Sequence, residues 1–286
     1  MTSTNPNYVL VTGASRGIGR IIAIRLVQAG FHVFAGVRNP EAAEVLRSDL
    51  GEDRVTPLSL DVTDASSVDE AARTVESAVG GKGLAGLVNN AASATFGPVE
   101  TVPITEVERE LAVNVIGPVR MTQACLPLLR RARGRLINVS SVNGFLSIPG
   151  SGIYSASKFA LEGLSDALRF ELRPWGIEVI VVQPGVFGTD IRARALESWR
   201  GRRELLPEEG RELYDSMFEA TQKLLPAMDE QAPSPEPVAE AVLEALTVEH
   251  PQTRYPVGDD MAEYAALAGQ PDRSRDAAFA EMFGSS

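Results

Sequence analysis

The most informative segment of the chain reads Thr12-Gly13-Ala14-Ser15-Arg16-Gly17-Ile18-Gly19, with three glycines spaced G-x-x-x-G-x-G. It follows an apolar run at 8–11, typical of a buried strand, and opens a helical stretch that reaches about residue 29. Between a strand and a helix, such glycines allow a tight turn, close approach of a pyrophosphate, and close helix–sheet packing. The N-terminus of the helix directs free N–H groups and its positive dipole end at an anion. The segment predicts a dinucleotide site, and an ordinary glycine-rich turn is the alternative.

The alternation of short apolar runs with longer amphipathic stretches continues along the chain. Runs rich in Val and Ile that alternate with helices indicate βαβ units and a parallel sheet covered on both faces. Because crossovers between parallel strands are right-handed, we predict an α/β fold with a single Rossmann-type doubly wound parallel sheet flanked by helices. The further strand candidates lie at 31–37, 55–60, 84–89, 135–140 and 177–182.

The end of the second predicted strand indicates which dinucleotide the site prefers. An NAD site usually places Asp or Glu there to bond the ribose 2′-OH. Here the strand ends Ala35-Gly36-Val37-Arg38-Asn39 and offers no carboxylate. Arg38 can pair with a 2′-phosphate as a planar donor, and Arg16 can close from the other side. We therefore predict that NADP(H) is preferred, with NAD(H) as the alternative if Arg38 is only a solvated turn residue.

Ser141, Tyr154 and Lys158 form a candidate catalytic set. Tyr and Lys four residues apart lie on the same face of a helix. A phenol has a pKa near ~10, and lowering it by ~3 units requires roughly 4 kcal/mol in favour of the anion. The Lys158 ammonium and an oxidised nicotinamide can supply much of this. Tyr154 is then the predicted general acid or base, and Ser141 the predicted hydrogen-bond partner of the same substrate oxygen.

In its motifs the chain resembles the short-chain dehydrogenase/reductase family over roughly residues 7–190. The matching segments are TGxxxGxG at 12–19, Asp61-Val62 after the third strand, Asn89-Asn90-Ala91-Ala92, Asn114, the Ser141, Tyr154 and Lys158 set, and Pro184-Gly185-Val186-Phe187-Gly188-Thr189. The one departure is Ala92, which stands where the family's NNAG segment has Gly.

The resemblance implies a role for each matched residue. Asn114 is expected to hold a water linked to Lys158, and Lys158 to hold the nicotinamide ribose. The catalytic residues are thus expected to be Asn114, Ser141, Tyr154 and Lys158. The expected cofactor-binding residues are Gly13, Ser15, Arg16, Gly17, Ile18, Gly19, Arg38, Asp61, Val62, Asn90, Ala91, Tyr154, Lys158, Pro184, Gly185, Val186 and Thr189.

We predict a single domain over 1–286, with a core at about 7–190, a substrate lid at about 190–232, and a C-terminal helix, strand and tail at 233–286. The lid carries apolar residues that suit a large apolar substrate, although packing onto the domain is the better explanation for most of them. They are Leu196, Trp199, Leu213, Met217, Phe218, Leu224 and Met228. Phe145, Ile148, Pro149 and Phe187 flank the catalytic motifs as further candidate pocket residues.

Composition restricts the class of protein. The net charge is −11, and residues 191–286 hold 10 basic and 19 acidic side chains against 17 and 19 in residues 1–190. This acidity argues against nucleic-acid binding. One Cys and two His predict no disulfide and no metal site, and fit a reducing cytoplasm. The longest apolar run is too short for a membrane span, and we expect no membrane partner.

The expected activity is that of an NADP(H)-dependent oxidoreductase that interconverts a carbonyl and a secondary alcohol, reducing a small hydrophobic ketone or aldehyde. The family resemblance also implies a homodimer or homotetramer, formed through the helices that carry Asn114 and Tyr154. The alternatives are an NAD-dependent alcohol dehydrogenase of the same family and a dinucleotide-sensing regulator without catalysis.

Overall fold

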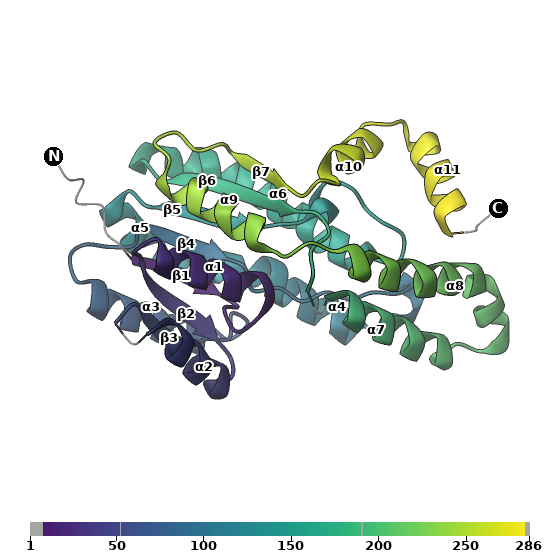
Figure 1. Cartoon of the computed structure of the whole chain (residues 1–286), viewed down its shortest axis with the longest axis horizontal. Coiled ribbons are helices and arrows are strands. Elements are labelled where there is room, and N and C mark those ends of the chain that lie inside the picture. Colours follow the sequence, from purple (N-terminus) through teal and green to yellow (C-terminus); the bar gives the residue numbers. More distant parts are fainter. Residues whose placement is uncertain (1–7, 52, 190, 284–286) are drawn as a thin grey trace.

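A computed structural model describes residues 8–51, 53–189 and 191–283. Seven parallel strands form one sheet in the order β3-β2-β1-β4-β5-β6-β7, which confirms the predicted doubly wound α/β fold (Figure 1). The strand order reverses between β1 and β4, where a doubly wound sheet opens a crevice at the carboxyl ends of its strands. The strands are β1 (Tyr8–Thr12), β2 (His32–Val37), β3 (Val55–Ser59), β4 (Gly86–Asn89), β5 (Arg135–Val139), β6 (Glu178–Pro184) and β7 (Arg254–Val257).

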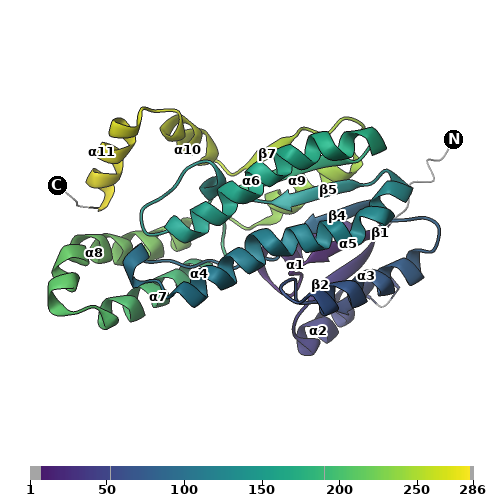
Figure 2. The same cartoon turned by 180° about the vertical axis from the view of Figure 1, so that it is seen from behind.

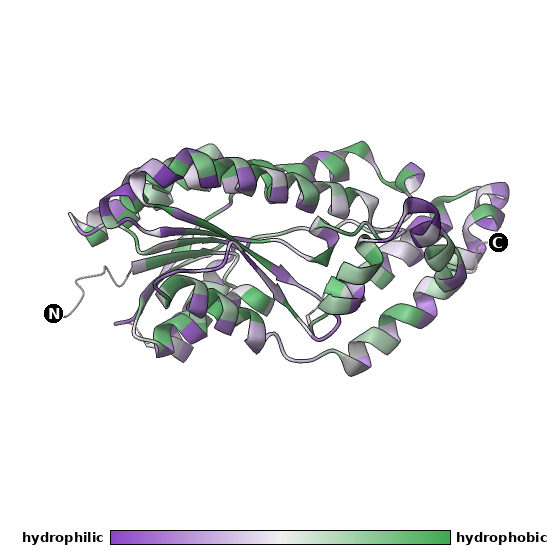
Figure 3. Ribbon diagram, turned by 90° about the horizontal axis from the view of Figure 1, so that it is seen from above, coloured by the Kyte–Doolittle hydropathy of each residue, from purple (hydrophilic) through white to green (hydrophobic). Residues whose placement is uncertain are grey.

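Two layers of helices cover the sheet. One face carries α1 (Gly17–Gln28), α2 (Pro40–Leu50) and α9 (Glu236–Thr247) (Figure 1). The opposite face carries α3 (Ala65–Val79), α5 (Gly117–Ala132) and α6 (Gly152–Leu172) (Figure 2). Each layer encloses its own apolar core, one around Val9, Ile22 and Val242 and the other around Leu10, Val75 and Met121. Figure 3 shows the hydrophobic strands enclosed between these layers.

Two prolines lie in the outermost strands. Pro57 pairs with Ala35 of β2, and Pro256 pairs with Gln183 of β6. Because proline has no N–H for the ladder, sheets accept it at their edges, and β3 and β7 are the two edges of this sheet. The predicted third strand is therefore present despite its proline.

Further helices gather at the end of the molecule where the strands terminate. α7 (Ile191–Leu205) and α8 (Glu208–Gln231) follow β6, within the range predicted to form the lid. α10 (Met261–Ala268) and α11 (Asp272–Phe283) follow β7, and α11 packs against α8 (Figure 1). Only a tail is predicted after β7, so the sequence did not indicate these two helices. The predicted boundary residue 190 lies outside the described residues.

The segment between β4 and α5 is built from several short helical pieces. A 3₁₀ turn (Val99–Thr101) precedes α4 (Ile104–Leu111), which leads into a π-helical turn (Ala112–Ile116) before α5. Two more 3₁₀ turns, Val142–Gly144 and Arg173–Trp175, follow β5 and α6. π-Helical turns occur frequently at functional sites, and this one contains Asn114.

Candidate active site

The glycine turn leaves no room for side chains at two of its three glycines. Gly13 has a φ of +68°, and a Cβ there would lie 2.8 Å from the Cα of Ala91. A Cβ on Gly19 would lie 2.3 Å from the carbonyl oxygen of Gly13. Gly17 has a φ of +53°, but its Cβ would meet only the Thr189 side chain, at 3.9 Å. The turn is thus closely packed beneath and open above Gly17, as a phosphate cradle requires.

Asn90 holds this turn in place from the end of β4. Its side-chain amide donates to the carbonyl oxygens of Thr12 and Gly13, at 2.9 and 3.2 Å. The hydroxyl of Thr12 in turn accepts from the backbone N–H groups of Asn90 and Ala91, both at 3.0 Å. Asn90 and Ala91 therefore shape the predicted cofactor site by supporting its backbone.

The first turn of α1 is available to an anion. Arg16 is the N-cap residue in an extended conformation, and within the described residues its side chain makes no capping hydrogen bond. The helix dipole and uncapped N–H groups favour a negative group at this position. The cradle and the helix end therefore fit the pyrophosphate of a dinucleotide, with Ser15 and Ile18 on either side of the exposed pair Arg16 and Gly17.

Arg38 and Asp61 lie beyond the glycine turn, at the ends of β2 and β3. Arg38 is exposed. Burial acts to raise the pKa of Asp61, but hydrogen bonds from Thr63 and the nearby Arg38 charge hold that pKa below its usual range. Val62 is buried and packs over Gly117, where a Cβ would lie 2.8 Å from its side chain. These residues are set apart from the catalytic positions by the widths of β1 and β4.

Ser141, Tyr154 and Lys158 meet at the ends of β5 and α6. Lys158 is 3% exposed, donates to the carbonyl oxygen of Val139 at 2.8 Å, and has its ammonium 5.7 Å from the centre of the Tyr154 ring. Burial lowers the pKa of Lys158 to about 8, against the opposing effect of Glu110 and Glu162. The ammonium is therefore mostly charged at pH 7.

The pKa of Tyr154 is raised, whereas the sequence analysis expects it to be lowered when a cofactor is bound. Burial raises its pKa to about 12, while the hydroxyl of Ser141 acts to lower it and the charge of Glu110 to raise it. The phenol is enclosed in the fold and loses more hydration as an anion than as a neutral group. In this state Tyr154 holds its proton at neutral pH.

Asn114 is fixed by three hydrogen bonds. Its side-chain amide donates to the carbonyl oxygen of Ser93 at 2.8 Å and to the hydroxyl of Ser157 at 2.9 Å. Its side-chain oxygen accepts from the backbone N–H of Ser93 at 2.8 Å. Both amide hydrogens are therefore used, and a relay water of the kind the family resemblance implies can be held by Asn114 only through an acceptor oxygen. The sequence analysis does not name Ser157 as a site residue. Its only sequence signal is that it lies between Tyr154 and Lys158.

Glu110 is a buried acid that the sequence analysis did not single out. It lies one helical turn before Asn114 and is 0% exposed. Among the described residues, neither carboxylate oxygen has a hydrogen bond of normal geometry. Burial raises the pKa of Glu110 to about 7, while Thr95 and Lys158 act to lower it. The burial of Glu110 could not be predicted from the helical pattern, because the rest of α4 is largely exposed.

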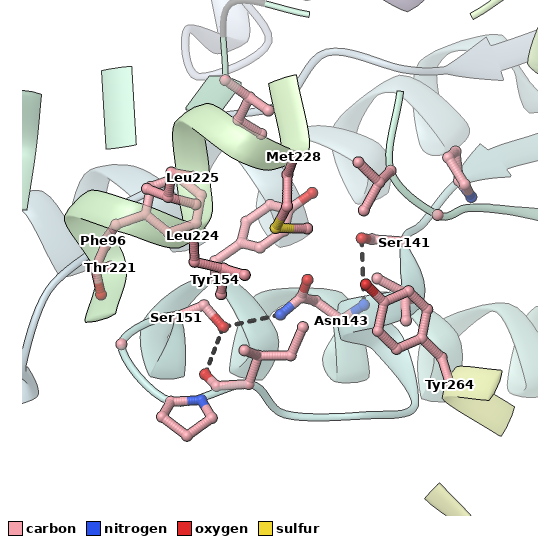
Figure 4. A pocket seen from close by; sticks show the side chains of 18 of the residues that line it. Phe96, Ser141, Asn143, Ser151, Tyr154, Thr221, Leu224, Leu225, Met228 and Tyr264 are labelled. Carbon is pink, nitrogen blue, oxygen red and sulfur yellow. Dashed lines mark hydrogen bonds between the residues drawn. The ribbon is translucent and has the colours of Figure 1, made fainter. Parts of the chain in front are cut away.

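A cavity of about 400 Å³ opens at Ser141 and Tyr154, two of the predicted catalytic residues. Figure 4 shows Tyr154 and Ser141 at its wall, with Leu224, Leu225 and Met228 of α8 arranged around it. Its lining is largely apolar, and α7, α8, α10 and α11 all contribute to it. The site residues Ile18, Pro184, Gly185, Val186 and Thr189 border the same cavity.

The predicted lid and pocket residues divide into two groups. Trp199, Leu224 and Met228 line the cavity, as do Ile148, Pro149 and Phe187. Trp199 also packs edge-on against buried Phe218, with the ring centres 5.0 Å apart. Leu213 is 77% exposed and contributes no apolar wall, and Phe145 packs beside the cavity against Val142 and Leu146.

The family model described as short chain dehydrogenase matches residues 7–199. The chain belongs to the short-chain dehydrogenase family. It is 37% identical over 261 residues to a retinol dehydrogenase 5 of Mus musculus, covering 88% of this chain and 81% of that protein. It is 35% identical over 278 residues to an NADPH-dependent 3-dehydrocapnine reductase of Ornithobacterium rhinotracheale, covering 95% of each. A Burkholderia cenocepacia short chain dehydrogenase in complex with NADP is similar in structure, with a TM-score of 0.71, 28% identity and 96% of each chain covered.

As a member of this family the chain is an oxidoreductase that acts on CH–OH groups and uses a nicotinamide dinucleotide. The residues predicted to hold the dinucleotide lie along the crevice, with Arg38 at one end, Tyr154 at the other and the glycine turn between them. The described part of the chain contains no cluster of side chains suited to hold a metal ion. Nor does any helix in that part have both the length and the apolar character needed to cross a bilayer.

Proposed function

We propose that this chain is an NADP(H)-dependent reductase of hydrophobic ketones or aldehydes, interconverting carbonyl and alcohol with Tyr154 as the general acid and base. One observation carries the proposal: a protonated, buried Tyr154 forms the wall of a largely apolar cavity beside Ser141, at the end of a dinucleotide crevice. In the reducing direction the cofactor supplies a hydride to the carbonyl carbon when it is bound. Tyr154 gives its proton to the oxygen of the same group.

The protonation states of the buried groups support Tyr154 as the proton donor in reduction. A phenol with a pKa of about 12 is protonated at neutral pH and serves as a proton donor without prior activation. Ser141 can hydrogen-bond the same oxygen and stabilise its developing charge. The Lys158 ammonium, close to the ring, stabilises the tyrosinate that remains after transfer. In the oxidising direction Tyr154 takes up the alcohol proton as its anion, which Lys158 and the positive charge of an oxidised nicotinamide would favour.

The preference for NADP(H) over NAD(H) rests on Arg38. It is exposed at the end of β2, where a 2′-phosphate would lie, and the end of that strand has no carboxylate to repel the phosphate. The NADP-bound structural neighbour and the NADPH-dependent relative support the same choice. The NAD(H) alternative predicts comparable or faster turnover with NADH.

The hydrophobic substrate class rests on the cavity. A volume of about 400 Å³ falls in the range of sites for drug-sized ligands, and its largely apolar wall favours hydrophobic molecules. The relative named retinol dehydrogenase 5 is consistent with a substrate of this kind.

The deciding experiment is a substrate panel with purified protein and NADPH or NADH. We expect NADPH-dependent reduction of one or more of all-trans-retinal, 2-decanone and a 3-ketosteroid. Tyr154→Phe should lower kcat by about 10²–10⁴, because the proton donor is removed. Tyr255→Phe, a buried tyrosine in β7 away from the cavity, is the matched control and should retain activity. Full activity of Tyr154→Phe, or no turnover on the whole panel, would contradict the proposed function.

We further propose that the whole chain forms a single domain and works in the cytoplasm as a homodimer or homotetramer. One continuous sheet joins the elements from β1 to β7. Apolar side chains stand exposed along the outer side of α6, which is consistent with an interface there.

A further inference from the structure

The C-terminal helix pair α10 and α11 forms part of the cavity wall, although it lies beyond the residues 7–199 that the family model matches. Met261 packs against Val142 and Leu146, in the segment that follows Ser141. Tyr264 and Phe279 lie in the same apolar group. Residues far from the catalytic motifs in sequence are thereby brought to the reacting end of the cavity.

Asp260 anchors this helix pair to the cofactor side of the site. Its carboxylate accepts from the backbone N–H of Val186 at 2.9 Å. A Cβ on Gly185 would lie 2.2 Å from the same carboxylate, so Asp260 fills the space that a side chain at 185 would take. The backbone N–H of Tyr264 donates to the carbonyl oxygen of Asp260 at 3.1 Å, in the first turn of α10. Tyr264 therefore lies one helical turn from Asp260, which is itself hydrogen-bonded to Val186.

The hydroxyl of Tyr264 points at the hydroxyl of Ser141 (Figure 4). Ser141 already accepts a hydrogen bond from the backbone N–H of Asn143 at 3.2 Å. A serine hydroxyl has two acceptor positions and one proton. A second donor at its remaining acceptor position leaves the Ser141 proton to point into the cavity, where Tyr154 and the substrate oxygen lie.

Neighbouring polar groups on this side of the cavity are engaged with one another. The Asn143 amide donates to the hydroxyls of Ser151 and Ser155, at 2.8 and 2.9 Å, and Ser151 donates to the carbonyl oxygen of Ile148 at 2.7 Å (Figure 4). This network fixes the turn after Ser141 from below. Tyr264 reaches Ser141 from a separate element, α10.

We propose that Tyr264 is a positioning residue for Ser141: its phenol donates to the Ser141 oxygen, so that Ser141 directs its own proton at the carbonyl oxygen of the substrate. The inference rests on the proposed function and extends it to the C-terminal helices. A phenol is a stronger proton donor than a serine hydroxyl, so donation from Tyr264 also polarises the O–H bond of Ser141. The packing of α10 thus adds the Tyr264 hydroxyl to those of Ser141 and Tyr154 in an otherwise largely apolar cavity.

A double-mutant cycle tests the proposal with the fastest substrate of the panel and NADPH. Tyr264→Phe removes only the hydroxyl and keeps the ring. We expect kcat to fall about 10-fold, with KM changed less than about 3-fold, because the hydroxyl acts on the transition state through Ser141. In a Ser141→Ala background the same Tyr264→Phe change should have almost no further effect.

Two controls accompany the cycle. Tyr255→Phe should leave kcat and KM unchanged, and thermal unfolding should show that Tyr264→Phe folds like the wild type. Unchanged kcat in Tyr264→Phe, or losses that multiply in the double variant, would overturn the role of Tyr264. Loss of activity in Tyr154→Phe alongside full activity in Tyr264→Phe would overturn this inference alone. Full activity in Tyr154→Phe would instead overturn the proposed function.

Discussion

Arg38 stands exposed at the end of β2, where the distinction between the two dinucleotides is made. Hydrogen bonds from Thr63 and the nearby charge of Arg38 together hold the pKa of Asp61 below its usual range. A planar, always charged donor at this point suits a 2′-phosphate. It also places a positive group where an NAD site would hold a carboxylate.

Arg38→Asp should reverse the preference for the cofactor. We expect kcat/KM for NADPH to fall by about 100-fold, because the new carboxylate repels the 2′-phosphate, and that for NADH to hold or rise. Steady-state rates with both cofactors measure this. Arg47→Ala, an exposed arginine of α2 paired with Glu44, is the control and should leave the ratio unchanged. A strong NADH preference in the wild type would refute the assignment.

Glu110 carries a proton that affects stability. Its pKa is about 7 in the fold against 4.5 for a free side chain, so the folded state binds the proton more tightly. Below pH ~4.5 both states are protonated and the group contributes nothing. As the pH rises through 7, the free energy of unfolding falls by up to about 3 kcal/mol in total, because the folded protein must bury the ionised carboxylate.

Glu110→Gln should remove this loss. The variant is expected to unfold at a higher temperature than the wild type at pH 8 and at nearly the same temperature at pH 4.5. Thermal unfolding followed by circular dichroism across this range provides the measurement. Glu108→Gln changes an exposed acid of the same helix and should shift neither value. Equal pH dependence in Glu110→Gln and wild type would show that Glu110 is not the group responsible.

At the scale of elements, the lid depends on a glycine in the loop before α6. Gly150 has a φ of +78°, and a Cβ there would lie 2.1 Å from the ring of Trp199 in α7. Its carbonyl oxygen also accepts from the backbone N–H of Gly97 at 2.8 Å. The lid helix therefore rests directly on backbone, with no space for even a methyl group.

Gly150→Ala should displace α7 and open the cavity. We expect KM for the bulkier panel substrates to rise at least about 5-fold, and the left-handed φ to cost about 1 kcal/mol of stability. Kinetics across the panel and thermal unfolding measure the two effects. Gly163→Ala, in helix α6 with open space around its Cβ, should leave KM unchanged and raise stability slightly. An unchanged KM in Gly150→Ala would show that the lid does not need this contact.

Elements with a strong local pattern were predictable, and those set by tertiary contact were not. The buried runs at β1, β5 and β6 are apolar enough to be predicted as strands, and the glycine turn has a spacing that few other structures require. α10 and α11 have no comparable signal, because their apolar side chains face a cavity built by other elements. Tyr264 was missed for this reason, and Glu110 because its burial depends on how α4 meets α6.

On the scale of the whole molecule, exposed aromatic side chains mark the outer side of α6. Phe159 and Phe170 are 46% and 73% exposed, and Trp175 just beyond the helix is 45% exposed. The Arg130 guanidinium of α5 lies 3.9 Å from the centre of the Trp175 ring. Large apolar groups gathered on one face of a soluble domain are typical of an interface between chains.

Phe159→Glu should dissociate the assembly. We expect light scattering to give a mass near two or four chains for the wild type and near one chain, 30.6 kDa, for the variant. A charge introduced at a buried interface loses its hydration without gaining a partner. Leu213→Glu, on the exposed side of α8, is the control and should keep the wild-type mass. A monomeric wild type would contradict the proposed oligomer.

The prolines of the two outermost strands limit how copies of this chain can join. A strand from another molecule that approached β3 or β7 would meet a residue unable to donate to it, at Pro57 or Pro256. Continuous intermolecular sheets, and the fibrils that grow from them, are thereby disfavoured at both ends. Association is left to the helical faces, so the protein can reach a high concentration without its sheet acting as a template for its neighbours.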